Sequence, residues 1–512
     1  MIELLTAAQM RAIEAHEIES GRVTGAGLME VAGEGVVAAV FAAWPELAQT
    51  SQKAVVLCGP GNNGGDGFVV ARLLRGWGWE AEVFLYGEPG RLPPDAKLNH
   101  DRWAALGPVR LLGFPQVVAD AAQLVRAAAE DAALVVDALF GTGVTRALDG
   151  LAPLIDAVQG ARVVAVDIPS GLCADSGRVI GGHVVRAALT VPFHRAKLGH
   201  YLAQGPEICG VLDVRDIGLP HLETTEEVRR AVPDVRRLAK DVSAHKFGHG
   251  HALVLTGGAG RTGAARLAAR AALRVGAGLV TLGVPGAAQM EVASQIAALM
   301  LTRIDDAAAM AEVLEDVRIG ALCLGPGLGL KRAEVLVPQA LGAGRNVVLD
   351  ADALTAFAGQ PDALFDLLHD GCLLTPHMGE FARLFPDLAA EISGAITIGP
   401  APSKVEAVRK AAHRAGATVL LKGADTVIAA PDGRAVLSAA CYDQAAPWLA
   451  TAGSGDVLAG LVTGLLARGM APLEAAKNGA WLHAEAGRVL GAGLIAEDLP
   501  EALPTVLKSI GI

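Results

Sequence analysis

The chain has 512 residues, with 43 Lys and Arg against 54 Asp and Glu, and therefore a formal net charge of −11. At about 150 residues per domain this length predicts several domains, and the acidic balance argues against nucleic acid as the main partner, because phosphate neutralisation needs clustered Lys and Arg. No apolar run is long enough to span a membrane without Gly, Pro or a charge, and no basic region precedes an apolar block at the start, so we expect neither a membrane partner nor a secretory signal.

Two helices are predicted at the N-terminus, the first beginning at a capping box formed by Thr6 and Gln9. Four short apolar runs follow, each ahead of a Gly-rich or polar turn and helix-compatible sequence. They lie at 53–58, 81–86, 133–137 and 161–167. This alternation is typical of βαβ units and predicts a parallel sheet. The apolar residues are 52% of the chain but the aromatics only 4%, so Ala, Val and Leu must fill these layers.

The alternation stops over 213–250, which is charged and contains prolines, and a second series of strands begins at His251. We therefore expect two α/β domains, over 1–222 and 244–512, joined by a linker over 223–243. Within the second domain, Pro431-Asp432-Gly433 predicts a hairpin, so that sheet is expected to be mostly parallel with a short antiparallel part. Residues 386–403 are expected to form an exposed insertion.

Oxygen-bearing side chains follow several strands of the first domain. The segment Gly59–Gly67 lies between a strand and a helix, where backbone N–H groups can bind a pyrophosphate; the alternative is a tight turn whose glycines supply positive φ. Asp137, Asp167 and Ser170 follow two later strands. Because the carboxyl ends of parallel strands meet at one edge, these side chains and Asn63 are expected to face one ligand. The alternative is that each aspartate only caps the next helix.

Oxygen ligands of low total charge suit a hard and even monovalent cation better than zinc. His245, His249 and His251 have a spacing that resembles a metal site, but no cysteine accompanies them and no metal is predicted there. Six cysteines lie far apart without Cys-x-x-Cys spacing, which predicts a reducing cytoplasm and no disulfide framework.

The second domain has its own helix N-terminus suited to phosphate. Gly453, Ser454 and Gly455 open a helix, and Asp456 lies in its first turn, where it can take a proton from a hydroxyl that attacks a phosphate. The alternative is an aspartate favoured only by the helix dipole, which is worth about 0.3–1 kcal/mol. His377 begins another helix and is either a ligand contact or a solvated cap.

Together the motifs resemble those of the bifunctional NAD(P)H-hydrate repair enzymes. They are GPGNNGGDG, VDALFGTG and VDIPSG in the first half, and TGGAGRTGAA, LGPGLG, LTPHMGE, LKGADT and AGSGDVLAG in the second. The resemblance implies a Rossmann-like three-layer domain that epimerises the R and S hydrates of NADH and NADPH. It also implies a ribokinase-like domain that dehydrates the S hydrate with ADP, giving AMP and phosphate. K⁺ is implied for the first domain and Mg²⁺ for the second.

By motif position, the resemblance assigns Asp167 as the acid or base of the first reaction and Asp456 as the base of the second. In the first domain the hydrate is expected at Asn62, Asn63, Gly64, Gly65, Asp66, Gly141, Thr142, Gly143, Val144, Thr145, Arg146, Ala147 and Asp167. In the second it is expected at Ala264, Ala265, Gly327, Gly329, His377 and Asp456. The nucleotide is assigned to Lys422, Gly423, Ala424, Asp425, Thr426, Gly453, Ser454 and Gly455, and K⁺ to Asn63, Asp137 and Ser170.

Three other functions compete with this reading. A kinase of a small alcohol uses the same helix N-terminus but releases a stable phosphorylated product. The first domain alternatively serves only as a ligand-sensing or protein-binding module, although it keeps Asp167 and the oxygen ligands. A Rossmann oxidoreductase needs an acidic residue after the second strand, for which Glu88 is close. A homo-oligomer is expected.

Overall fold

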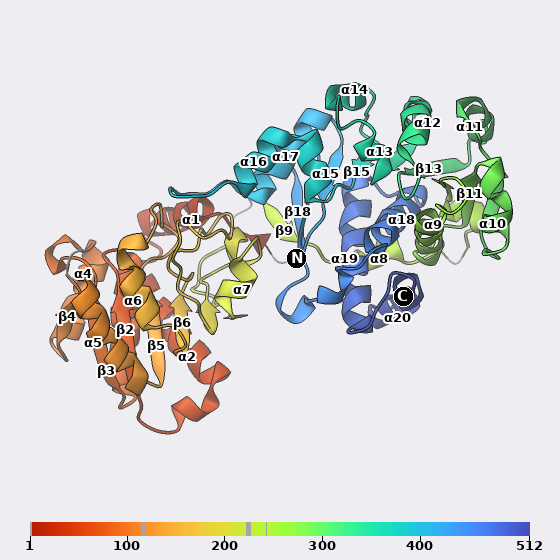
Figure 1. The fold of residues 1–512 in the computed structure, drawn as a ribbon. Coiled ribbons are helices and arrows are strands. Elements are labelled where there is room, and N and C mark those ends of the chain that lie inside the picture. The colour runs from red at the N-terminus through yellow and green to blue at the C-terminus, as the bar shows by residue number, and fades with distance from the viewer. Residues whose placement is uncertain (1–2, 114–117, 222–226, 242) are drawn as a thin grey trace. The chain divides into compact units, whose positions relative to one another are not determined.

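The computed structural model describes residues 3–113, 118–221, 227–241 and 243–512 (Figure 1). Two compact units are present. The N-terminal unit contains Glu3–Glu227 and Gly394–Ser403, and the C-terminal unit contains Val228–Ser393 and Lys404–Ile512. The predicted α/β class, with largely parallel sheets, is confirmed in both units. The domain limits predicted at 222 and 223 fall outside the described residues.

The N-terminal unit is built on a parallel sheet in the order β4-β3-β2-β5-β6-β7-β8. The strands of this sheet are β2 (Lys53–Cys58), β3 (Glu80–Leu85), β4 (Val109–Leu111), β5 (Leu134–Ala138), β6 (Val163–Val166), β7 (Leu189–Val191) and β8 (Val211–Leu212), and the unit begins with a short strand, β1 (Glu3–Leu4), that is not part of it. The helices are α1 (Ala7–Glu19), α2 (Gly25–Ala43), α3 (Asn62–Gly76), α4 (Pro94–Ala104), α5 (Val118–Asp131), α6 (Ala152–Ala157) and α7 (Gly205–Cys209). The sheet order is that of an open doubly wound domain.

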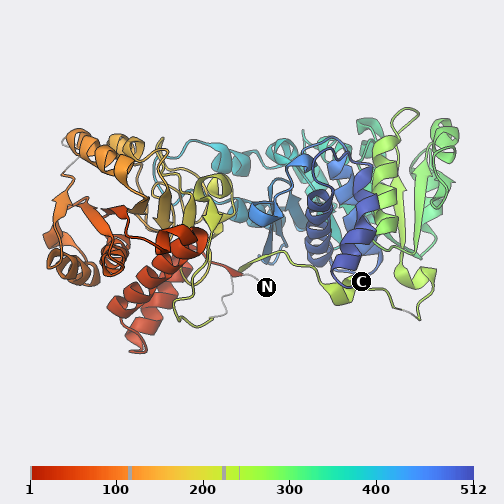
Figure 2. The ribbon, with the colours of Figure 1, turned by 90° about the horizontal axis from the view of Figure 1, so that it is seen from below.

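Successive residues of the central strands point to opposite faces of this sheet. Val56 and Val136 pack with α2, α3 and α4, whereas Val55 and Val135 pack with α5 and α6. Figure 2 shows helices on both sides of the sheet, so the predicted three layers are confirmed. The predicted capping box is also present, because the Thr6 hydroxyl accepts from Gln9 N over 3.1 Å and Gln9 Oε1 accepts from Thr6 N over 2.8 Å.

One helix, α2, is long and apolar enough to cross a membrane by length and composition. Its residues Leu28, Ala32, Val36 and Val40 are buried in the core of the N-terminal unit. The same length and composition are found in core helices of this kind.

The C-terminal unit has strands in the order β9-β18-β17-β16-β15-β14-β13-β10-β11-β12. Their bounds are β9 (Val228–Arg230), β10 (His251–Leu255), β11 (Leu279–Val284), β12 (Met300–Arg303), β13 (Ile319–Leu324), β14 (Asn346–Leu349), β15 (Cys372–Leu374), β16 (Thr418–Leu421), β17 (Asp425–Ala429) and β18 (Ala435–Ala439). Only the β16–β17 and β17–β18 pairs among these are antiparallel, which confirms the predicted hairpin and the mostly parallel sheet.

The helices of this unit pack closely because their facing residues are small. They are α8 (Val235–Leu238), α9 (Gly263–Arg274), α10 (Gln289–Ala293), α11 (Ala307–Leu314), α12 (Leu330–Gly342), α13 (Asp352–Thr355), α14 (Pro361–Phe365), α15 (Met378–Leu384), α16 (Pro386–Ser393), α17 (Lys404–Ala415), α18 (Ser454–Ala467), α19 (Pro472–Leu490) and α20 (Asp498–Ser509). Between α9 and α18, a Cβ atom on Gly460 would lie 2.1 Å from the carbonyl oxygen of Ala268. The Ala-rich composition therefore permits helix contacts that larger side chains would prevent.

The segment 386–403, predicted to be an exposed insertion, is exposed at most of its positions but is anchored by a few buried residues. Residues 386–393 form α16, in which Leu388 and Ala389 are buried. Residues 394–403 pack within the N-terminal unit, where Ala401 is buried beside Val144 and Ile180. No sign of these anchors is visible in the sequence, because their apolar partners lie far away along the chain.

Candidate functional sites

The loop between β2 and α3 needs glycine for close backbone approach. A Cβ atom on Gly59 would lie 1.6 Å from the carbonyl oxygen of Leu139, and one on Gly64 would lie 2.1 Å from that of Gly59. None of the glycines in Gly59–Gly67 has positive φ, so the explanation of the loop by positive φ is wrong. Asn62 begins α3, and the helix N-terminus therefore leaves backbone N–H groups available to a ligand at this edge.

Asp137 and Ser170 form a fully buried oxygen cluster at the ends of two neighbouring strands. Asp137 Oδ1 accepts from the Ser170 hydroxyl over 2.6 Å, and Oδ2 accepts from Ser170 N over 2.8 Å. Burial raises the pKa of Asp137 to about 6, although the hydrogen bonds from Ser170 and Leu139 oppose the rise. Among the described residues no Lys or Arg forms a salt bridge with this carboxylate, so its environment favours a cation.

The side-chain amide of Asn63 lies near this oxygen cluster, beside Gly141. Its Nδ2 is buried and has no hydrogen-bond partner within the described residues. Its Oδ1 lies against Gly141, where an added Cβ atom would be 3.0 Å away. The predicted set Asn63, Asp137 and Ser170 thus offers neutral and anionic oxygens at the same strand ends, which is the donor set of a low-charge hard cation.

Asp167 follows β6 in a strained conformation, with φ of 63°. Its Oδ1 accepts from Lys197 Nζ over 2.6 Å and from Phe193 N over 3.3 Å. His200 Nε2 donates to the carbonyl oxygen of Asp167 over 2.9 Å, while its Nδ1 accepts from Lys197 N. Burial, followed by the charge of Lys197, lowers the pKa of His200 to about 4, so this histidine is neutral at pH 7. Three contacts therefore hold Asp167 in its unusual backbone conformation.

Two further carboxyl groups interact with Asp167. Burial raises the pKa of Asp66 well above its usual range, and the charges of Asp167 and Glu14 raise it further. Burial also raises the pKa of Glu14, with Asp167 as the next cause. Asp167, whose carboxylate is paired with the Lys197 ammonium, thus lies near two carboxyl groups whose pKa is raised, Asp66 and Glu14. This arrangement is suited to proton transfer.

The loop 141–147 combines one anchored residue with several exposed ones. Val144 is buried, whereas Gly143, Thr145 and Arg146 are exposed. Of the predicted residues in this unit, Asn63, Gly141 and Asp137 lie around one strand edge, and Asp167 follows the next strand. Lys197, His200 and Glu14 were not predicted, because no spacing in the sequence links them to Asp167.

In the C-terminal unit the predicted phosphate site begins at Gly453, whose φ of +87° only glycine adopts easily, and α18 follows directly. Asp456 lies in the first helical turn. Burial raises the pKa of Asp456 to about 6, with Asp350 as the next cause and Lys422 acting in the opposite direction. Beneath the turn, Ser454 contacts His483 Nε2 over 3.0 Å.

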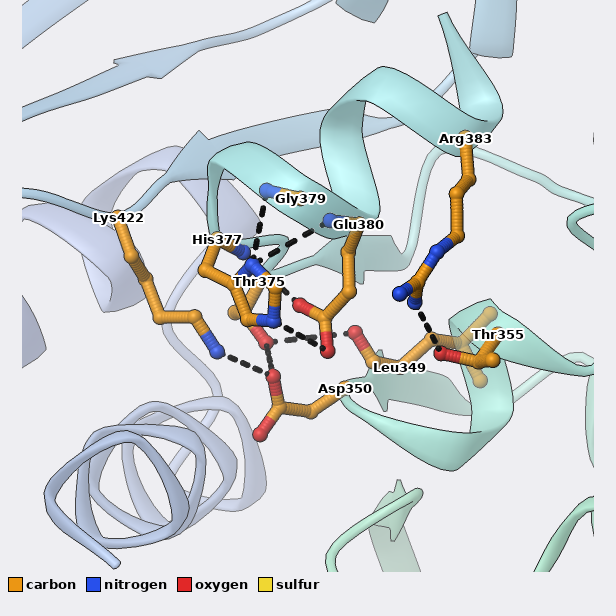
Figure 3. A network of polar contacts seen from close by, with 9 residues as sticks. All are labelled: Leu349, Asp350, Thr355, Thr375, His377, Gly379, Glu380, Arg383 and Lys422. Carbon is orange, nitrogen blue, oxygen red and sulfur yellow. Dashed lines mark hydrogen bonds and ion pairs between the residues drawn. The ribbon is translucent and has the colours of Figure 1, made fainter. Parts of the chain in front are cut away.

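Figure 3 shows a polar network that begins at the end of β14. Lys422 Nζ donates to Asp350 Oδ1 over 2.7 Å, and the Thr375 hydroxyl donates to the same oxygen over 2.9 Å. Ala351, the next residue, has φ of 44°, so the chain is strained beside Asp350. Asp350, Asp352 and Glu380 were not predicted, although Asp350 and Asp352 follow the strand NVVL as oxygen-bearing residues do elsewhere.

These carboxylates also lie close to Asp456. Asp350, Asp352 and Glu380 all raise the pKa of Asp456, after the larger effect of burial, whereas Lys422 lowers it. Four carboxyl groups against one ammonium leave an excess of negative oxygen ligands. This excess of negative charge would attract a cation that arrives with a nucleotide.

Glycine loops from two other strands meet α9. A Cβ atom on Gly257 would lie 2.0 Å from Gly327 O, and one on Gly327 would lie 3.5 Å from the Cβ atom of Ala264. Gly329 N donates to Asp352 Oδ2 over 2.8 Å. The structure thus brings together the predicted Ala264, Gly327 and Gly329, whereas the side chain of Ala265 is fully buried in the core.

His377 caps α15. Its Nδ1 accepts from Gly379 N over 2.9 Å and from Glu380 N over 3.3 Å, and its side chain is 56% exposed (Figure 3). His377 is thus a solvated helix cap, as one of the two interpretations of its position predicted. Its contact with a hydrate stays a prediction. His251, one of the three histidines for which no metal was predicted, forms a hydrogen bond with the Thr281 hydroxyl over 2.8 Å.

The predicted nucleotide loop connects β16 to β17. Gly423 O accepts from the Thr426 hydroxyl over 2.7 Å, which closes the turn. Lys404 Nζ donates to Asp425 Oδ1 over 2.7 Å, and this lysine was not predicted. At the end of the loop nearest α18, a Cβ atom on Gly455 would lie 3.3 Å from Lys422 Nζ. Lys422 therefore links the loop with the helix N-terminus.

Comparison with known proteins gives matches along both halves. Residues 252–507 match the family described as NAD(P)H-hydrate dehydratase, and residues 25–199 match the family described as YjeF-related protein N-terminus. The bifunctional NAD(P)H-hydrate repair enzyme Nnr of Moorella thermoacetica is 37% identical over 99% of this chain and 97% of its own. The NAD(P)H-hydrate epimerase of Rhodobacter capsulatus is 46% identical over 43% of this chain and 100% of its own.

Among solved structures, an ADP/ATP-dependent NAD(P)H-hydrate dehydratase from Bacillus subtilis, co-crystallised with ATP and Mg²⁺, is 27% identical with a TM-score of 0.44. It covers 55% of this chain and 94% of its own.

Proposed function

The chain belongs to the family of bifunctional NAD(P)H-hydrate repair enzymes, and from this premise we propose how its two units divide the work. The N-terminal unit epimerises the R and S hydrates of NADH and NADPH, and the C-terminal unit dehydrates the S hydrate with ADP, giving AMP and phosphate. The observation that supports this division is the presence of two separate acid–base centres, Asp167 with Lys197 and Asp456 at the start of α18.

In the epimerase unit, Asp167 acts as the base. Lys197 and Phe193 N occupy its Oδ1, while Oδ2 accepts no hydrogen bond from the described residues and is free to take a proton from the hydrate. Asp66, whose pKa is raised by burial and by the neighbouring carboxylates, is proposed as the group that donates a proton in this reaction. When Asp167 takes the proton of the hydroxyl, the bond from the hydrated carbon to the ring nitrogen breaks, leaving an aldehyde, and Asp66 protonates the nitrogen. The nitrogen then adds to the other face of the aldehyde while the two protons return, which gives the other epimer.

Asn63, Asp137 and Ser170 are proposed to hold K⁺. The buried Asp137 carboxylate and the Asn63 Oδ1 beside Gly141 support this assignment. A bound cation would supply positive charge for the diphosphate of the dinucleotide. Asn62 to Asp66 and Gly141 to Ala147 are proposed to bind the rest of the hydrate.

In the dehydratase unit, Asp456 takes the proton of the hydrate hydroxyl, whose oxygen then attacks the β-phosphorus of ADP. The bond from phosphorus to the bridging oxygen breaks and AMP leaves with that electron pair. The carbon–oxygen bond of the phosphorylated hydrate then breaks, phosphate departs, and a proton lost from the neighbouring carbon restores the double bond. Backbone N–H groups of Gly453, Ser454 and Gly455 and the ammonium of Lys422 stabilise the transferring phosphoryl group.

The negative charges of Asp350, Asp352 and Glu380 are proposed to attract Mg²⁺ to this site, where the ion would neutralise the nucleotide oxygens. Residues Lys422 to Thr426 are proposed to contact the nucleotide, and Ala264, Gly327, Gly329 and His377 the hydrate. Six free, buried cysteines support a reducing compartment, so we place the reactions in the cytoplasm. The homo-oligomer stays a prediction.

The test is recovery of reduced-nicotinamide absorbance from a mixture of R and S hydrates with Mg²⁺ and K⁺, comparing ADP, ATP and no nucleotide. Recovery of the whole mixture with ADP, faster than with an Asp167→Asn variant that reports spontaneous epimerisation, is the expected result. If no nucleotide restores absorbance and a phosphorylated product accumulates from a small alcohol instead, the chain is a kinase and the repair function is refuted.

A further inference from the structure

The segment Gly394–Ser403, here called the strap, runs along the substrate loop 141–147 of the N-terminal unit. Gly399 N donates to Thr145 O over 2.9 Å, and Arg146 and Ile398 form an antiparallel bridge. On its other side, Ile396 O accepts from Gly181 N over 2.7 Å. The strap therefore lies between two loops and is hydrogen bonded to both by backbone groups.

Apolar side chains fix the strap to the same loop. Ala401 is 4% exposed and packs with Val144, Cys173 and Ile180. A Cβ atom on Gly399 would lie 2.7 Å from Ile180 Cδ1 and 2.9 Å from Val144 O. Glycine at 399 is thus needed for the strap to approach the loop, because any larger residue would meet both a buried side chain and a backbone oxygen.

The loop 141–147 has little regular structure of its own. It lies outside the named helices and strands, and its contacts are at Gly141, which adjoins Asn63, and at Val144 with its neighbours, which adjoin the strap. Gly143, Thr145 and Arg146 remain exposed. A loop of this kind loses conformational freedom when it binds a ligand, and a pre-formed loop avoids that cost.

We propose that the strap is a positioning element of the epimerase site, encoded in the sequence between α16 and α17 of the dehydratase unit. By holding Val144 and the backbone of Thr145, it keeps the loop ready to bind the hydrated dinucleotide. This inference rests on the proposed epimerase function. It assigns to ten residues within the dehydratase half of the sequence an effect on the reaction of the other unit.

The test compares Gly399→Val, which moves the strap away from Val144 and Ile180, with Ile398→Ala as the matched control. The Ile398 side chain is 74% exposed, so its removal leaves the backbone bridge intact. For Gly399→Val we expect the KM of the R hydrate in epimerisation to rise about tenfold while kcat stays within about twofold, since the loop must then be ordered by the substrate itself. Ile398→Ala is expected to keep the wild-type KM.

Two further measurements separate this effect from misfolding. Dehydration of pure S hydrate with ADP is expected to be unchanged in both variants, and the backbone amide of residue 399 is expected to exchange hydrogen faster in Gly399→Val than in the wild type. Ala401→Gly, which removes one buried methyl group, should raise the same KM to a smaller extent. The inference is overturned if the amide of residue 399 exchanges faster in Gly399→Val but the KM does not change. A wild-type protein without epimerase activity instead refutes the proposed function.

Discussion

Lys197 Nζ donates to Asp167 Oδ1 over 2.6 Å, and the lysine side chain is completely buried. Lys197 also donates to Phe193 O over 3.1 Å, so its charge is shared between one carboxylate and one carbonyl. A buried ammonium is costly to hold unless it is paired. The pair therefore fixes both the position of Asp167 and its backbone strain at φ of 63°.

Replacing Lys197 with Met should remove most epimerase activity. The carboxylate loses its partner at Oδ1 and the support for its strained backbone, and loss of a positioned acid–base group costs about 10²–10⁴-fold. We expect kcat/KM for epimerisation to fall by at least about 100-fold while dehydration of pure S hydrate is unchanged. Lys53→Met is the control, because Lys53 pairs with Asp131 at the surface over 3.4 Å. Equal losses in both variants would show that Lys197 has no special role.

Asp167→Asn and Asp456→Asn should separate the two reactions. Each amide keeps the shape of the side chain but cannot accept a proton as a carboxylate does. Asp456→Asn is expected to abolish dehydration and to leave epimerisation intact, and Asp167→Asn is expected to do the reverse. Epimerisation is measured by chromatography of the two hydrates, and dehydration by absorbance with ADP. Loss of both activities in either variant would refute two independent sites.

Dehydration should depend on pH through Asp456. Its pKa is raised to about 6, first by burial and next by Asp350. Because the base acts in its deprotonated form, kcat/KM for the S hydrate should fall tenfold per pH unit well below pH 6 and reach a plateau above it. Lys422 lowers this pKa, so Lys422→Met should move the midpoint of the profile to higher pH as well as reduce the plateau. An unchanged midpoint in that variant would exclude Asp456 as the titrating base.

Much of the fold could be predicted from the sequence because the strands are short apolar runs followed by glycines, as at 53–58 and 251–255. The positions of Asp137, Asp167 and Asp456 followed from the same pattern, since strand ends and helix starts are marked locally. Lys197 could not be predicted, because its contact with Asp167 joins residues 30 positions apart and depends on how two loops fold. The contact between the strap and the loop 141–147 could not be predicted for the same reason, because Ala401 and Val144 are far apart in sequence and meet only through tertiary packing.

The close packing of α9 on α18 makes a prediction about stability. In Gly460→Ala the new methyl group would lie 2.1 Å from Ala268 O, a backbone atom that cannot turn aside. Overpacking of this kind costs about 1–3 kcal/mol. We expect dehydratase activity to be lost at a lower temperature than in the wild type, while epimerase activity keeps its wild-type inactivation temperature, because the helices belong to the C-terminal unit.

Gly342→Ala is the control, since Gly342 is exposed in α12 with no atom within 4 Å of an added Cβ. That variant should be neutral or slightly stabilised by the better helix propensity of Ala. If Gly460→Ala is as stable as Gly342→Ala, the two helices can separate without cost and small residues are not required at their contact.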